Sequence, residues 1–213
     1  MNINEIFLSI QGEGYYTGEK MVFVRTEYCN LRCSWCDTKY SFNEGRNMSL
    51  DEIGEVVDNL AQNNVKWVCL TGGEPLLQKD VNNLVRRLSD RYRILLETSG
   101  SLDIKRFIPD YGMIRKDIDF KLPSSGMYRK FNDKNLGYIE DGDYIKFVVN
   151  DRNDFSVAMN EIRAMDSHTG IVIQPVYGTE VKWLADEFIE KAPDNARLML
   201  QEHKYIYGDI RGV

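Results

Sequence analysis

The chain has 213 residues, of which 43% are hydrophobic and 28% are charged, values typical of a globular protein with a sizeable core. We expect residues 1–213 to form one domain, because this length suits one domain and no linker-like segment interrupts the chain. The net charge of −6, with no block rich in Lys or Arg, excludes a basic surface that would attract nucleic acid.

The first residues, MNINEIFLSIQGEG, contain no basic stretch followed by an apolar one, so they do not predict a signal peptide. The sequence also has no run of about 18 apolar residues that could span a membrane. We therefore expect a cytoplasmic protein with no membrane partner and no nucleic-acid partner. In that reducing compartment, clustered cysteines indicate metal binding or catalysis rather than disulfides.

Apolar runs and helical periods alternate along most of the chain, beginning with a predicted strand at residues 21–26. A helix follows from Ser49, which forms a capping box with Glu52 and precedes apolar residues at helical spacing as far as Leu60. Beyond this helix, the same patterns predict a strand at 67–70, a helix at 81–88, strands at 93–98, 118–122 and 144–149, a helix at 155–165, a strand at 170–175, a helix at 181–191 and a strand at 197–200. Residues 121–143 are polar and lack a helical period, which predicts a loop or a small insert.

Strands that alternate with helices indicate an α/β fold, with a mostly parallel sheet covered by helices. A complete barrel of eight βα units usually needs about 250 residues. The chain is shorter than that, so we expect a partial, open βα barrel with some of the crossovers shortened.

The distinctive residues of this sequence follow the predicted strands. In parallel sheets and barrels, functional side chains gather at the carboxyl ends of the strands, which meet on one face. The residues found there are Cys29, the segments 71–75 and 97–100, Lys121 with Pro123 and Ser124, and Gln174 with Pro175. This arrangement predicts a single site on one face.

Three of the four cysteines, Cys29, Cys33 and Cys36, fall within one short segment. Thiolates are the usual protein ligands of iron–sulfur clusters, and three of them would leave one iron of a four-iron cluster open to another molecule. A structural zinc site is the alternative, but zinc usually takes a fourth ligand. The candidates for that ligand are Cys69, His168 and His203, and none of them belongs to a second Cys-x-x-Cys pair.

The spacing Cys-x-x-x-Cys-x-x-Cys, followed after the next predicted strand by Gly-Gly-Glu-Pro at 72–75, resembles the radical S-adenosylmethionine (SAM) superfamily. The resemblance covers most of the chain. It implies that Cys29, Cys33 and Cys36 hold a 4Fe-4S cluster whose open iron is chelated by SAM. Electron transfer from the cluster would then cleave SAM to a 5′-deoxyadenosyl radical, while the protein positions and shields the reactants.

Further segments narrow the resemblance to one family. These are SIQGEG at 9–14, Arg25 four residues before Cys29, Cys36-Asp37-Thr38, KLPSSG at 121–126, and the terminal segments 201–204 and 211–213. Together they resemble 7-carboxy-7-deazaguanine synthases, carbon–nitrogen lyases that convert 6-carboxy-5,6,7,8-tetrahydropterin to 7-carboxy-7-deazaguanine with loss of ammonia. The product feeds queuosine, archaeosine and related 7-deazapurine pathways. The resemblance also implies a homodimer and an electron-donor protein such as flavodoxin or ferredoxin.

The resemblance assigns roles to individual residues. The implied substrate contacts are Ile10, Gln11, Gly12, Arg25, Thr71 and His203. The implied SAM contacts are Trp35, Cys36, Asp37, Gly73, Ser99, Lys121 and Gln174. Thr38 would ligate a Mg²⁺ ion that bridges to the substrate, which suits a cation that takes few ligands from protein.

Simpler roles exist for several of these residues. Arg25 could pair with a carboxylate such as Glu97, and Thr38 could cap the turn that follows it. His203 could be a structural histidine, and Trp35 could cover the cluster rather than stack on adenine. Cys69, inside an apolar strand, reads as a buried apolar residue. Glu13 could be a surface carboxylate, and it is not among the predicted site residues.

Two other functions remain open at this point. A glycyl-radical enzyme activase shares the cysteine spacing, although SIQGEG and Cys36-Asp37-Thr38 argue against it. A non-catalytic iron–sulfur or zinc module is the other alternative.

Overall fold

The computed structural model describes residues 1–62, 64–107 and 113–213. Within them, one sheet of nine strands runs in the order β3-β1-β2-β4-β5-β6-β7-β8-β9. The strands are β1 (Asn2–Ile10), β2 (Lys20–Thr26), β3 (Arg46–Asn47), β4 (Trp67–Gly72), β5 (Arg93–Thr98), β6 (Ile114–Phe120), β7 (Tyr144–Val149), β8 (Gly170–Pro175) and β9 (Ala196–Leu198). The helices are α1 (Leu50–Ala61), α2 (Val81–Ser89), α3 (Arg152–Arg163), α4 (Lys182–Lys191) and α5 (Glu202–Tyr207).

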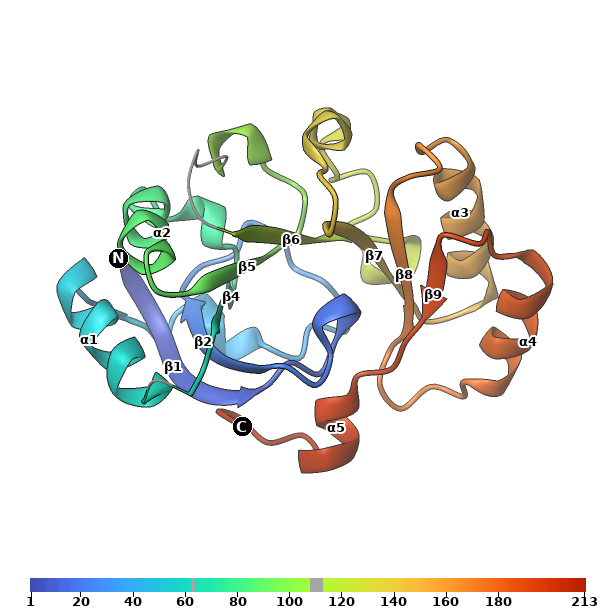
Figure 1. The fold of residues 1–213 in the computed structure, drawn as a ribbon. Coiled ribbons are helices and arrows are strands. Elements are labelled where there is room, and N and C mark those ends of the chain that lie inside the picture. The colour runs from blue at the N-terminus through green and yellow to red at the C-terminus, as the bar shows by residue number, and fades with distance from the viewer. Residues whose placement is uncertain (63, 108–112) are drawn as a thin grey trace.

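Along the run β2-β4-β5-β6-β7-β8-β9, adjacent strands pair in parallel, whereas β1 pairs antiparallel with β2 and β3. The sheet curves, and helices α1 to α4 lie along its outer side (Figure 1). The C-terminal segment with α5 returns to the β1 side, where Glu202 N–H donates to Gly12 O at 2.8 Å and Arg211 Nε donates to Glu5 Oε2 at 3.1 Å. The fold is therefore the expected open barrel, with its terminal segment packed against its first strand.

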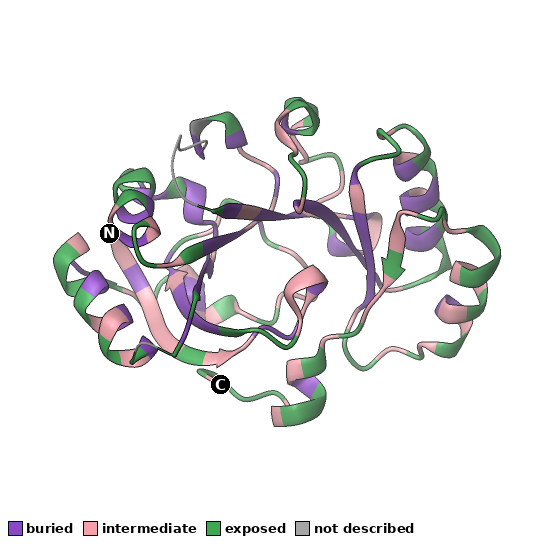
Figure 2. Cartoon of the chain, viewed as in Figure 1, coloured by how far each residue is buried: buried purple, intermediate pink, exposed green. Residues whose placement is uncertain are grey.

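The helices cover the sheet with their apolar sides. Figure 2 shows buried residues concentrated along the strands and on the sheet-facing sides of the helices, with exposed residues on their outer sides. Helix α1 begins with the predicted capping box, in which Ser49 Oγ accepts from Glu52 N–H at 3.2 Å and Glu52 Oε2 accepts from Ser49 N–H at 2.7 Å. Its buried residues Ile53 and Val57 join the larger apolar core.

The strands and helices predicted from the sequence are all present, with small differences at their ends. The largest difference is in β6, which begins at Ile114 rather than at 118 and ends at Phe120. The charged residues Lys116 and Asp117 hid its start. Both are buried because they form ion pairs, Lys116 with Asp143 at 2.6 Å and Asp117 with Lys146 at 2.8 Å.

Two strands and one α-helix went unpredicted: β1, β3 and α5. Strand β1 is mostly half-buried, so it lacks the continuous apolar run of the central strands, and α5 buries only Lys204. The segment 121–143 forms two 3₁₀ turns, Pro123–Ser125 and Asp133–Tyr138, joined by irregular backbone. No helix in the described part of the chain has both the length and the apolar character needed to cross a membrane.

Candidate active site

A cavity of about 420 Å³ opens at the carboxyl ends of the parallel strands. All sixteen residues predicted as cluster, SAM, Mg²⁺ or substrate contacts line it. They are Ile10, Gln11, Gly12, Arg25, Cys29, Cys33, Trp35, Cys36, Asp37, Thr38, Thr71, Gly73, Ser99, Lys121, Gln174 and His203. The structure thus brings these residues to one place, while the ligand assigned to each stays a prediction.

Sheet register explains why residues distant in sequence meet there. Arg25 on β2 lies directly beside Thr71 on β4, and Glu97 on β5 beside Asp117 on β6. The row continues with Asp119 beside Lys146 and Val148 beside Gln174. Because side chains alternate across a strand, one inward-facing row supplies polar groups from six neighbouring strands to the cavity.

The cysteine segment is anchored at its start by the Gly-Gly-Glu-Pro turn. Gly73 N–H donates to Thr26 O at 3.0 Å, and Glu74 N–H donates to Tyr28 O at 2.7 Å. A Cβ atom on Gly73 would collide with the Tyr28 carbonyl, so this position requires glycine for close packing. Tyr28 itself has a φ of 73°, an unfavourable value for a tyrosine, which the two neighbouring hydrogen bonds help to hold.

The Glu74 side chain connects the ends of β4 and β5. It is fully buried, and its carboxylate accepts four hydrogen bonds. Oε1 accepts from Leu76 N–H at 3.1 Å and from Thr98 Oγ1 at 2.8 Å, while Oε2 accepts from Ser99 N–H at 2.8 Å and from Ser99 Oγ at 2.6 Å. The Ser99 hydroxyl predicted to face SAM is therefore oriented by Glu74.

A second anchor holds the middle of the cysteine segment. Ser34 Oγ donates to Ser124 O at 2.6 Å, and Trp35 Nε1 donates to Ser124 Oγ at 3.2 Å. Asp154, fully buried at the start of α3, accepts from both the amide and the hydroxyl of Ser124. Because Ser34 and Trp35 lie between Cys33 and Cys36, this contact fixes the part of the segment that carries those two thiols.

The three thiols are half-buried and line the same cavity. Burial raises the pKa of Cys29, Cys33 and Cys36, and the nearby Lys121 ammonium opposes that increase at all three. Among the described residues, no three Cys, His, Asp or Glu side chains approach closely enough to enclose a single metal ion. Three thiols beside one cation in an open cavity nevertheless suit the thiolate ligation of a cluster that keeps one iron open.

Polar groups without partners mark the side of the cavity predicted to hold SAM. The Gln174 side chain has no exposure, yet neither its Oε1 nor its Nε2 has a hydrogen-bond partner among the residues that the structure describes. A buried amide in this state calls for a ligand or water, so the cavity fits a polar cofactor here. Lys121 pairs with Asp119 at 2.9 Å, and its Nζ lies 5.5 Å from the centre of the Trp35 ring.

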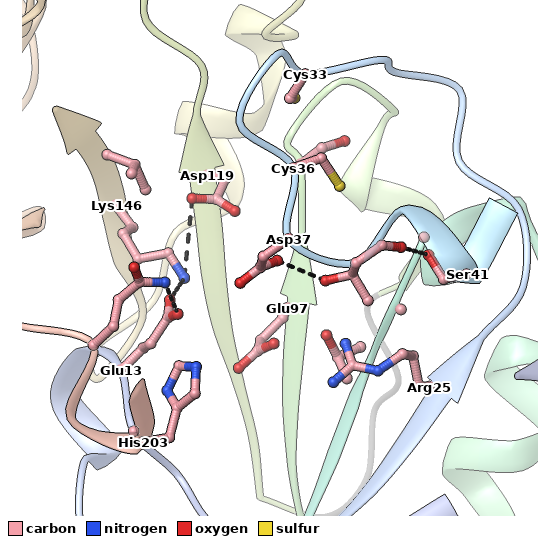
Figure 3. A pocket seen from close by; sticks show the side chains of 18 of the residues that line it. Glu13, Arg25, Cys33, Cys36, Asp37, Ser41, Glu97, Asp119, Lys146 and His203 are labelled. Carbon is pink, nitrogen blue, oxygen red and sulfur yellow. Dashed lines mark hydrogen bonds and ion pairs between the residues drawn. The ribbon is translucent and has the colours of Figure 1, made fainter. Parts of the chain in front are cut away.

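The opposite side of the cavity carries the residues predicted to bind substrate. Gln11 Nε2 donates to Glu97 Oε1 at 2.7 Å, and Arg25 projects into the cavity from β2 (Figure 3). The Nε atom of Arg25 pairs with Glu5 at 2.7 Å, so the carboxylate partner considered from the sequence, Glu97, is not its direct partner. His203 also lines the cavity, and its backbone and ring lie against Gly12 so closely that a Cβ atom there would clash.

Thr38 is the N-cap residue of the 3₁₀ turn that follows it, but it contributes to that turn through its backbone carbonyl, which accepts from Ser41. Its side chain makes no capping hydrogen bond to the 3₁₀ turn Lys39–Phe42, and its hydroxyl donates instead to Asp37 Oδ1 at 2.7 Å. The two side chains therefore present adjacent oxygen atoms at the cavity. This donor set suits Mg²⁺, which prefers oxygen ligands.

Glu13, which could have been a surface carboxylate on the sequence alone, is largely buried. Its side chain is only 18% exposed and pairs with Lys146 at 2.8 Å. Burial opposes ionisation of Glu13, but Lys146 and His203 outweigh it, so its pKa lies well below the ordinary value. Neither Glu13 nor Lys146 was among the predicted site residues, because the contact joins positions 133 residues apart in sequence.

Comparison with known proteins agrees with this geometry. A family model described as "Radical SAM superfamily" matches residues 23–130. A 7-carboxy-7-deazaguanine synthase of Thermoplasma acidophilum is 41% identical over all of both chains, and one of Koribacter versatilis is 37% identical over 97% of each. This chain belongs to the 7-carboxy-7-deazaguanine synthase family.

Solved structures share the fold of this chain. The crystal structure of QueE from Escherichia coli superposes with a TM-score of 0.70, covering 95% of this chain and 94% of that one, at 24% sequence identity. A structure of Streptococcus suis SuiB bound to S-adenosylmethionine matches with a TM-score of 0.60 over 84% of this chain. The sheet of this 7-carboxy-7-deazaguanine synthase family member is thus shared with both.

Cluster binding is tested by exchanging thiols one at a time. Cys33→Ala removes a cavity thiol and should abolish the 4Fe-4S cluster, whereas Cys69→Ala should retain it, because Cys69 is buried in β4 without exposure. The measurement is iron content and visible absorbance after anaerobic reconstitution. Full cluster loading of Cys33→Ala, or a folded Cys69→Ala protein without iron, would count against this ligand set.

Proposed function

We propose that this chain converts 6-carboxy-5,6,7,8-tetrahydropterin to 7-carboxy-7-deazaguanine with loss of ammonia, as a radical SAM lyase. The observation that carries the proposal is full-length membership of the family. The gathering of all the predicted contact residues around one cavity supports it further. Such a cavity also suits a small substrate better than the partner protein on which a glycyl-radical enzyme activase acts.

Each part of the cavity has a task in this proposal. Cys29, Cys33 and Cys36 hold the cluster, and Gly73, Ser99 and Gln174 contact SAM. When bound, the cluster and SAM supply a 5′-deoxyadenosyl radical next to the substrate. The protein contributes anchored ligands around one cavity, which keep the reactants in position.

Substrate recognition in this proposal rests on placed charges. The overall charge of −6 disfavours an anionic substrate, so local cations must hold its carboxylate. Glu5 orients Arg25 by binding its Nε atom, and we assign the rest of the guanidinium to the substrate carboxylate. Ile10, Gln11, Gly12, Thr71 and His203 complete the proposed substrate contacts.

The proposal also includes partners. A cluster that cleaves SAM needs one electron per event, so we include a low-potential electron-donor protein of the flavodoxin or ferredoxin kind. Half-buried Cys33 and exposed Ser34 support access to the cluster from solvent. The proposal further includes a homodimer, which the resemblance implies, and a cytoplasmic location.

Turnover tests the proposed reaction. Reconstituted protein, incubated anaerobically with SAM, a reductant and the carboxylated tetrahydropterin, should yield equal amounts of 7-carboxy-7-deazaguanine and ammonia, which together account for all the atoms of the substrate. 5′-Deoxyadenosine, measured separately by mass spectrometry, reports cleavage of SAM. Cleavage of SAM without the deazapurine would retain the radical SAM chemistry and reject this substrate. If protein with a fully loaded cluster does not cleave SAM, both the radical SAM chemistry and this substrate are rejected.

A magnesium series tests the metal role proposed for Thr38. One hydroxyl and a neighbouring carboxylate form a weak Mg²⁺ site, so affinity for the ion should rise when substrate adds its own oxygen ligands. Binding of metal and substrate is then reciprocal. Chelation should raise the KM for substrate more than it changes SAM affinity, and Thr38→Ala should reproduce that effect, with Thr38→Ser milder. Turnover indifferent to Mg²⁺, or a full Mg²⁺ response in Thr38→Ala, would remove this role.

A further inference from the structure

Lys146 is a buried cation at the inner wall of the cavity. Its side chain projects inward from β7 and is only 5% exposed. The Nζ atom lies 2.8 Å from Glu13 Oε2, 2.8 Å from Asp117 Oδ2 and 3.9 Å from Asp119 Oδ1 (Figure 3 shows the contacts with Glu13 and Asp119). One ammonium group thus stands among three carboxylates contributed by two other parts of the chain.

Of these three carboxylates, Glu13 is the one placed next to the proposed substrate contacts. It lies one residue from Gly12 and two from Gln11, and Gln11 Oε1 accepts from its amide at 3.1 Å. Its Oε1 accepts from Gln201 Nε2 at 2.8 Å, which leaves the carboxylate held from two sides. His203 is close enough to influence its ionisation.

We propose that Lys146 is a positioning residue for the substrate, acting through Glu13, which it keeps ionised and directed at the cavity. The inference rests on the proposed function for the identity of the ligand. A reduced pterin presents amino and ring N–H groups, and an ionised carboxylate accepts hydrogen bonds from such donors, whereas a protonated carboxyl offers a competing donor. Lys146 would therefore determine whether this wall of the cavity can accept hydrogen bonds from the pterin.

Because of the groups that surround Lys146, its removal changes the pKa of Glu13 in one direction only, which is upward. Among the described residues, the other charged or titratable groups that interact with Lys146 or Glu13 are Asp117, Asp119, Glu97, Lys121, Tyr144 and His203. Burial already raises the pKa of Asp117 to about 7, even though Lys146 lowers it. Lys121 is bound to Asp119 and cannot take the place of Lys146. Without Lys146, burial would act on Glu13 with much less opposition, and its pKa would rise.

The ionisation of Glu13 determines how pterin affinity should change with pH. In the wild type, the lowered pKa of Glu13 keeps it ionised from about pH 6 to about pH 8.5, a range well above the ordinary carboxyl value. In Lys146→Met, Glu13 should be protonated at the low end of this range and ionise as the pH rises. Pterin affinity in the variant should therefore increase with pH relative to wild type, by up to about tenfold per pH unit for one proton.

The experiment is a calorimetric titration of the carboxylated tetrahydropterin into full-length, anaerobically reconstituted protein with SAM present, across this pH range. At low pH, Lys146→Met should weaken pterin binding by on the order of 30-fold or more, as expected when one partner of a buried charge pair is lost. Lys146→Arg, which keeps the charge, should recover most of the affinity. Glu13→Gln should bind weakly at every pH, and SAM affinity should stay within about twofold throughout.

Lys116 provides a matched control. It is another buried lysine with a buried carboxylate partner, Asp143 at 2.6 Å, but it does not line the cavity. Lys116→Met should lower stability without changing pterin affinity or its pH dependence. Equal affinity of Lys146→Met and wild type at all pH values, or a uniform loss with no pH dependence, would overturn the inference.

A wild-type protein that binds no pterin would contradict the proposed function instead. The role of Lys146 would then be decided by ¹³C carboxyl NMR of Glu13. A titration that moves to higher pH in Lys146→Met supports the inference, and an unchanged titration overturns it.

Discussion

The buried carboxylate of Glu74 is the constraint on which the active site depends. A carboxylate without access to water must have its oxygen atoms hydrogen-bonded, or its burial becomes costly. Here the backbone of Leu76, the hydroxyl of Thr98, and the amide and hydroxyl of Ser99 meet that need. The main chain of the same residue holds Tyr28, directly before the first cysteine. One residue therefore fixes the relative positions of the ends of β2, β4 and β5.

The remaining polar groups form a charged interior within an otherwise acidic protein. Arg25, Lys121 and Lys146 each enter the cavity region paired with at least one carboxylate. Such pairs seldom add much to stability, since desolvation offsets their attraction. Their value is in orientation, because each cation is held at a defined place and keeps a defined charge. This is what binding an anionic substrate inside an acidic chain requires.

The sequence was sufficient for the central strands, the helices α1 to α4 and the cavity residues that lie in motifs. Continuous apolar runs identify buried parallel strands, and Cys29 or Gly73 stand at strand ends where function gathers. Glu13 could not be assigned in the same way. Whether a carboxylate lies at the surface or pairs with a buried lysine depends on contacts between distant segments, here the β1–β2 connection and β7. The clue available was Lys146 within an apolar strand, where an unpaired charge would be unfavourable.

The second anchor of the cysteine segment, Ser124 held by Asp154, also depends on a contact between distant segments that sequence pattern does not reveal. Ser124 belongs to a recognised motif, but Asp154, which holds it, is an ordinary helix-start residue by sequence. Strand β1 and helix α5 were hidden because they are short of buried apolar residues, and their positions are set by pairing with β2 and by contact with Gly12. Local pattern thus identifies the chemistry, while long-range pairing decides how the cavity is closed.

The most direct test of this account is the SAM affinity and cluster content of Glu74→Gln, with Glu52→Gln at the exposed start of α1 as the control. The amide keeps one acceptor but turns N–H₂ toward donors at Thr98 or Ser99, leaving buried groups unpaired at a cost of about 1–3 kcal/mol. The account predicts a protein with native secondary structure, faster hydrogen exchange over residues 28–36, lower cluster content and SAM affinity weakened by roughly tenfold. Wild-type cluster content and SAM affinity in Glu74→Gln would contradict it.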